Sequence, residues 1–134
     1  MNEKIDQRGV EVVKDMLSPE AAEGMLNPTP GTFAPEMGQL SINTVFAHLW
    51  TRPGLSRRDR SLITVAALIA TRANHELRYH FPIALKNGVT KEELEELIYH
   101  LTGYVGFPPA ASASQLANEL FGEAPGADHS KTIR

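Results

Sequence analysis

The sequence contains no cysteine among its 134 residues. That absence excludes a disulfide framework, a thiolate nucleophile, a thiol redox cycle and a thiolate zinc site. There is also no apolar run long enough to span a bilayer, and no apolar signal-peptide core near the N-terminus. We therefore expect a cytoplasmic protein that does not bind membranes.

The chain carries little net charge, with a formal value of −3. This mild acidity argues against a protein that binds nucleic acid by neutralising phosphates. The hydrophobic fraction of 42% is typical of a soluble globular protein, and the length allows one ordinary domain. We expect a single domain over residues 1–121, followed by a polar tail over residues 122–134.

Apolar residues recur at helical spacing along most of the chain, and no alternating strand pattern of useful length appears. We therefore expect an all-α fold of about seven helices. The expected helices are 4–17, a short helix from Pro19, 35–50, 56–72, 75–88, 90–106 and 109–121. Ser18 and Ser56 are expected N-caps, and Thr90 with Glu93 forms an expected capping box.

Two of these helices have unusual features. The second half of helix 56–72 is apolar nearly all round, so we expect it to be central in the fold. Pro82 lies inside helix 75–88, where it should kink the helix or shift its start.

Glu76 and His80 are the first candidates for chemistry. They are four residues apart on one expected helix and so share a face, whereas His75 faces elsewhere. A nearby carboxylate raises the pKa of an imidazole, which suits a general acid or base near neutral pH. The same spacing also fits a surface ion pair or a buried structural histidine, which is the commoner case.

Arginines cluster at the start of the expected helix 56–72. Arg57 and Arg60 share a face, whereas Arg58 diverges. Guanidinium groups bind carboxylates bidentately, so this helix end is a candidate site for an anionic substrate. A solvated basic end that pairs with Asp59 or a neighbouring helix is an equal alternative.

Three further polar positions deserve comparison with their structural alternatives. His100 and Tyr104 are four residues apart on an otherwise apolar helix, where they either line a cavity or are satisfied in the core. His48 lies close to Trp50 at a helix C-terminus, where the helix dipole favours an imidazole. No two histidines form an HxxxH or HExxH motif, so the sequence gives little support for a metal site.

Several short motifs follow one another in a fixed order between residues 43 and 120. They are Trp50 with Arg52-Pro53-Gly54-Leu55, Arg60-Ser61-Leu62, Glu76-Leu77-Arg78 with His80, Asn87-Gly88-Val89-Thr90, and Tyr104 with Gly106, Pro108 and Ala110. At these spacings the set resembles the carboxymuconolactone decarboxylase family, and in particular its γ-carboxymuconolactone decarboxylase branch. The resemblance implies the all-α, alkylhydroperoxidase D-like fold in a ring-shaped homo-oligomer, a trimer or a hexamer built as a trimer of dimers.

The same superfamily includes alkylhydroperoxidase D-like proteins that carry a CxxCxxxH motif. Laying this motif on His80 places its two cysteines at Ala73 and Glu76. A thiol peroxidase needs a thiolate, so that activity is excluded for this chain.

For the decarboxylase branch, the resemblance implies conversion of 4-carboxymuconolactone to 3-oxoadipate enol-lactone and CO₂, without a cofactor. This reaction is a step of aromatic catabolism through protocatechuate, in the β-ketoadipate pathway. The implied proton donor is His80, oriented by Glu76. Arg60, with Arg52 or Arg57, would hold the substrate carboxylates. The remaining implied pocket residues are His48, Trp50, His100 and Tyr104.

The chain departs from the branch at two positions. His48 stands where the branch usually has an acidic residue, and Pro82 stands where it usually has an ordinary helix residue. A paralogue with related acid–base chemistry, such as an isomerase or hydrolase of another lactone or keto acid, is therefore one alternative. A family member without catalysis is another.

Overall fold

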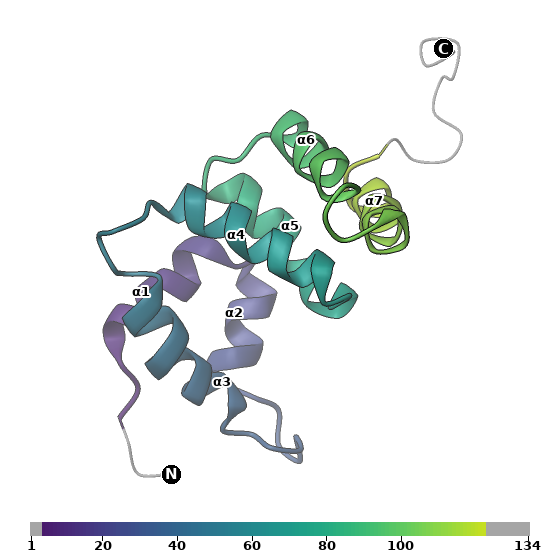
Figure 1. Cartoon of the computed structure of the whole chain (residues 1–134). Coiled ribbons are helices and arrows are strands. Elements are labelled where there is room, and N and C mark those ends of the chain that lie inside the picture. The colour runs from purple at the N-terminus through teal and green to yellow at the C-terminus, as the bar shows by residue number, and fades with distance from the viewer. Residues whose placement is uncertain (1–3, 123–134) are drawn as a thin grey trace.

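The computed structural model describes residues 4–122, and all regular structure in this range is helical (Figure 1). The elements are α1 (Gln7–Met16), α2 (Pro19–Leu26), α3 (Met37–Ser41), the π-helix η1 (Ile42–Leu49), α4 (Arg57–Ala70), α5 (Asn74–Lys86), α6 (Lys91–Leu101) and α7 (Phe107–Phe121). The expected all-α class is confirmed. Within residues 4–122, no helix is long and apolar enough to cross a membrane. Apart from Gly122, the expected polar tail lies outside the described residues.

Side chains cap the helices at the positions that the sequence indicated. Ser18, Ser56 and Thr90 each accept a hydrogen bond from the backbone N–H three residues further on. Glu93 completes the capping box by accepting a 2.9 Å hydrogen bond from the N–H of Thr90. Asp6 caps α1, so this helix begins three residues later than expected.

The helix expected over residues 35–50 is divided into two kinds of helix. α3 begins at Met37 and passes directly into η1, whose backbone makes wider, i→i+5 turns. The N–H of Trp50 ends this segment by donating to the carbonyl of Val45 at 3.2 Å. Hydrophobic periodicity indicated a helix here, but it does not distinguish a π-helix from an α-helix.

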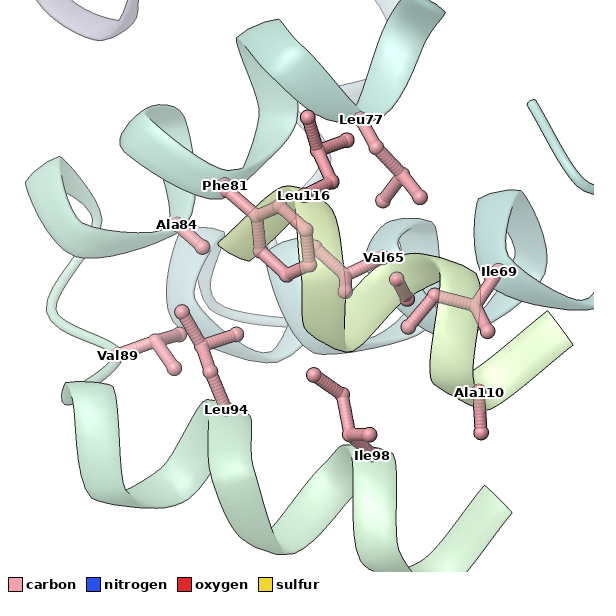
Figure 2. Packing of buried hydrophobic residues seen from close by; sticks show 11 residues of the cluster. Val65, Ile69, Leu77, Phe81, Ala84, Val89, Leu94, Ile98, Ala110 and Leu116 are labelled. Atoms are coloured by element: carbon pink, nitrogen blue, oxygen red, sulfur yellow. The ribbon is translucent and has the colours of Figure 1, made fainter. Parts of the chain in front are cut away.

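Two hydrophobic clusters form the core, and α5 contributes to both. The first joins α4, α5, α6 and α7, and Figure 2 shows the side chain of Phe81 in its middle. The second joins α1, α2, η1 and Trp50 to Ile83 of α5. Because His80 and Ile83 are three residues apart, they share the face of α5 that is turned toward η1.

The two helices with unusual features can be compared with their expected positions. α4 packs against α5, α6 and α7, as expected for a central helix, although Ile63 in its first half is 56% exposed. Pro82 lies inside α5 with an exposed side chain and does not delay the start of the helix, which begins at Asn74.

Gly9 allows α1 to lie directly on η1. A Cβ at this position would overlap the backbone oxygen of Ile42, a fully buried residue, whereas a Cβ at Gly24 on α2 would meet open space. We expect Gly9→Ala to lower the free energy of unfolding by about 1–3 kcal/mol, the usual effect of overpacking. The matched variant Gly24→Ala should raise it by up to about 1 kcal/mol through helix propensity. Urea unfolding measures both, and equal effects would contradict the close α1–η1 contact.

Candidate functional site

His80 is a half-buried histidine on α5 that lies beside Trp50. The two rings stack with centroids 6.4 Å apart and planes inclined by 19°. The Nδ1 atom of His80 is buried and has no hydrogen-bond partner. The stacking on Trp50 holds the imidazole of His80 in place. Its unpartnered nitrogen is still able to exchange a proton or bind a ligand.

A hollow of about 400 Å³ opens beside His80 and is called the Arg60 hollow here. Its wall is mostly apolar, with a guanidinium, an imidazole and two hydroxyl groups as its polar groups. The lining residues are Ser41, Val45, Phe46, Leu49, Trp50, Leu55, Arg60, Ile63, Thr64 and His80. An apolar cavity with a few convergent polar groups is the usual form of a small-molecule site.

Arg60 is the fixed cation of this hollow. Its Nη2 donates a 3.0 Å hydrogen bond to the backbone oxygen of Arg52, which holds the guanidinium in place. Its Nε is buried and has no partner. Among the described residues, the buried side-chain nitrogen and oxygen atoms without a partner are this Nε and the Nδ1 of His80. Both residues line one hollow, which points to a ligand that supplies hydrogen bonds to them.

The π-helix explains how one segment supplies so much of this wall. Ser41, Val45, Phe46, Leu49 and Trp50 all line the Arg60 hollow. A π-helix has more residues in each turn than an α-helix, so side chains spaced four and five apart share one face. Of these residues, only Trp50 was a candidate from the sequence. Thr64 of α4, which also lines the hollow, was not a candidate either. The π-helix carries no signal in the sequence that would have identified them.

The pKa of His80 lies below its ordinary value of 6.5. Burial is the larger cause and lowers the pKa, while the nearby carboxylate of Glu76 acts in the opposite direction. Glu76 thus acts in the direction that the sequence indicated, but burial outweighs it. Because the unfolded chain binds this proton more readily than the folded chain, the contribution of His80 to stability falls as the pH drops below 6.5.

A second hollow of about 390 Å³ lies beside His80 and is called the Glu76 hollow here. Glu76 lines this hollow but not the Arg60 hollow, and no hydrogen bond joins it to His80 within the described residues. The full lining is Leu17, Glu20, Ala21, Gly24, Met25, Ser41, Phe46, Glu76, Tyr79, His80 and Ile83. The predicted pair is thus close enough to interact electrostatically, without a hydrogen bond between the two side chains.

The other arginines at the start of α4 do not line either hollow. Arg57 pairs with Asp15 at 3.4 Å, and Arg58 pairs with Glu93. Arg52 reaches the site through its backbone oxygen, which accepts from Arg60.

The remaining sequence candidates lie elsewhere. His100 and Tyr104 are both exposed and stack on one another, with ring centroids 4.9 Å apart. His48 is exposed on η1, and neither it nor the stacked pair lines the two hollows beside His80. Within residues 4–122, no three metal-ligating side chains gather into a group that could hold a metal ion.

Comparisons with known proteins agree with the motifs. The carboxymuconolactone decarboxylase family matches residues 35–119. A 4-carboxymuconolactone decarboxylase from Acinetobacter baylyi is 46% identical over 76 residues, which are 57% of this chain and 57% of that protein. The match therefore spans little more than half of the bacterial protein's length.

Two further relatives extend the comparison. The nitrosuccinic acid decarboxylase npaB from Metarhizium robertsii is 35% identical over 114 residues, which are 84% of this chain and 78% of that protein. An uncharacterized 15.0 kDa protein from Paracoccus denitrificans is 30% identical over 80 residues, covering 58% of this chain and 60% of that protein.

The opposing effects of burial and Glu76 on His80 can be separated by titration. We expect the imidazole of His80 to titrate below 6.5, and Glu76→Gln to move its midpoint lower still, because the variant removes the favourable negative charge. Two-dimensional NMR of the histidine side chains measures both midpoints. Glu92→Gln on α6, outside both hollows, is the control. A midpoint above 6.5, or an upward shift in Glu76→Gln, would contradict this description.

Proposed function

Because this chain belongs to the carboxymuconolactone decarboxylase family, we propose that it is a cofactor-independent decarboxylase whose substrate binds in the Arg60 hollow. One observation supports this location above others: Arg60 and His80, which line the same apolar cavity, each have a buried side-chain nitrogen without a hydrogen-bond partner. A cation and an acid–base group at one cavity are what the loss of CO₂ from a carboxylate substrate requires.

In the proposed complex, Arg60 holds the carboxylate that the substrate keeps. Its buried Nε–H has no partner in the protein, and its guanidinium is already positioned by the backbone oxygen of Arg52. Ser41 also lines this wall, whereas the hydroxyl of Thr64 donates a 2.8 Å hydrogen bond to the backbone oxygen of Arg60. The leaving carboxylate lies against the apolar part of the hollow. There it lacks the water that would stabilise its charge, so its departure as neutral CO₂ is favoured.

The first proposed substrate is 4-carboxymuconolactone. Its carbon–carbon bond to the leaving carboxylate breaks, CO₂ departs, and the electron pair passes through the ring double bond onto the lactone carbonyl. A proton then returns to carbon and gives 3-oxoadipate enol-lactone. The substrate provides its own electron sink, so no cofactor is needed, and the place of the reaction in aromatic catabolism follows from this substrate.

His80 is the proposed proton donor in this reaction. The carboxylate of Glu76 favours the charged imidazolium, and the negative charge of a bound substrate acts in the same direction. Together they oppose the burial that keeps the ring neutral in the free protein. Trp50 holds the imidazole plane by stacking.

A second candidate substrate is nitrosuccinate, because the relative that covers 84% of this chain is named for that acid. Here the carboxylate on the nitro-bearing carbon leaves, the nitro group takes the electron pair, and the carbon is then protonated. Both candidates keep one carboxylate and lose another that is attached to an electron sink. The Arg60 hollow, which has one guanidinium and an apolar wall, suits that shared pattern.

We propose that a second copy of the chain covers the mouth of the Arg60 hollow. Val45, Leu49, Leu55 and Ile63 line it and are between 37% and 56% exposed. Such a concentration of exposed apolar side chains is typical of an interface. This proposal agrees with the ring-shaped oligomer that the family resemblance implies.

Sedimentation equilibrium tests the oligomer. We expect a mass that is a multiple of the single chain, as a trimer or hexamer requires, and Ile63→Asp should shift the distribution toward the monomer because it places a charge in the interface. A wild-type protein that sediments as a monomer would contradict the proposed covering.

Release of CO₂ from each candidate substrate tests the activity. We expect His80→Gln to lower kcat about a hundredfold or more, because a positioned acid is lost, with KM nearly unchanged. Arg60→Lys should mainly raise KM, because lysine keeps the charge but lacks the Nε–H and the planar donor pair. Arg78→Lys on α5, whose guanidinium pairs with Glu119 on the exposed surface, is the matched control.

Other outcomes distinguish the alternatives. Turnover of another lactone or keto acid without release of CO₂ would indicate an isomerase or hydrolase. No turnover of any of these compounds would indicate a family member without catalysis. Full activity in His80→Gln would show that the proton donor has been assigned wrongly.

A further inference from the structure

His80 lies between two hollows of opposite charge. It lines both, together with Ser41 and Phe46. Arg60 lines only the first hollow, whereas Glu76 and Glu20 line only the second. The imidazole therefore has a cation on one side and carboxylates on the other.

The chemistry of decarboxylation makes this arrangement significant. The carbon–carbon bond to the carboxylate breaks, its electron pair passes to the substrate's electron sink, and a new carbon–hydrogen bond forms. Each turnover thus consumes one proton. If His80 gives that proton, it is left as neutral imidazole and must receive another from solvent before the next turnover.

Substrate and product occupy the Arg60 hollow during this time, and a covering partner would close it further. The Glu76 hollow offers a separate way to the imidazole. Glu20 and Glu76 on its wall are both exposed, so their carboxylates are in contact with water. Carboxylates are competent carriers of protons between water and an imidazole.

We propose that the Glu76 hollow is the entrance for the proton that recharges His80, and that Glu20 passes this proton inward from solvent. The inference rests on the proposed decarboxylation. Glu20 lies on α2, far in sequence from the other site residues, and has no part in holding the substrate. Its carboxyl group gives a proton toward His80 and takes the next one from water.

The charged and titratable groups around His80 are consistent with this direction. α4 supplies Arg60, α5 supplies Glu76 and Tyr79, and α2 supplies Glu20. The segment of α3 and η1 contributes the uncharged Ser41 and Phe46. The positive charge of Arg60 disfavours proton entry from its side, whereas both carboxylates attract a proton to the other side.

Pre-steady-state formation of the protonated product, followed by stopped-flow absorbance, tests the proposal. With Glu20→Gln mixed with substrate at a pH where His80 starts protonated, we expect a fast burst of about one protonated product per active site. The following steady-state rate should be about tenfold below wild type, because recharging is slowed while the first proton transfer is not. Added small carboxylic acids should restore this rate in Glu20→Gln and leave wild type unchanged. Glu23→Gln, on the same helix but outside both hollows, should behave as wild type.

A second pair of variants blocks the entrance without removing a carboxylate. Gly24 lines the Glu76 hollow, and a Cβ there meets open space, so Gly24→Leu should fold and fill the hollow, whereas Gly24→Ala fills little of it. We expect the same burst and slow phase in Gly24→Leu, and wild-type kinetics with Gly24→Ala. Binding of substrate in the Arg60 hollow should be unchanged in both.

The outcomes separate the two proposals. An active wild type whose steady state is unaffected in both Glu20→Gln and Gly24→Leu overturns the proton entrance and leaves the decarboxylase intact. A wild type that releases CO₂ from neither candidate substrate overturns the proposed function and this inference with it. Loss of the burst itself in Glu20→Gln also overturns the inference, because Glu20 would then act in the first proton transfer or in folding.

Discussion

The position of α5 between two hydrophobic clusters is the constraint on which the site depends. One face of this helix buries Leu77 and Phe81 against α4, α6 and α7, and another buries Ile83 against η1 and Trp50. His80 shares the second face and is therefore held at the boundary, against the indole ring. A surface histidine would keep its water shell, and a histidine deep in one cluster would have no access to a ligand. At this boundary the imidazole of His80 is partly buried and still accessible to a ligand.

Burial at this boundary has an energetic consequence that favours binding. A buried polar atom without a hydrogen bond destabilises a fold by roughly 1–3 kcal/mol. Arg60 and His80, which both line the Arg60 hollow, each contain one such atom, so a ligand that pairs with these atoms would regain this free energy. The hollow is thus organised for an anion before one arrives, and its apolar wall strengthens every charge interaction inside it.

The sequence was informative wherever the signal is local. The capping side chains, the helical class and the placement of Glu76 and His80 on one helix all follow from spacing or from short motifs. It was uninformative where tertiary packing decides. The π-helical turns that gather Ser41 and Leu49 have no sequence signature, and the pKa of His80 depends on burial that no spacing reports. For the same reason Arg57 was a candidate beside Arg60, although it pairs with Asp15 and does not line the hollow.

The central claim is that Arg60 and His80 form one anion-binding, proton-donating site. A crystal structure of the protein with an unreactive dicarboxylate bound tests it most directly. We expect one carboxylate on the guanidinium of Arg60, the body of the ligand against the apolar wall beside Trp50, and His80 within reach of the carbon that would be protonated. A dicarboxylate bound elsewhere, with the Nε of Arg60 and the Nδ1 of His80 still unpaired, would contradict it.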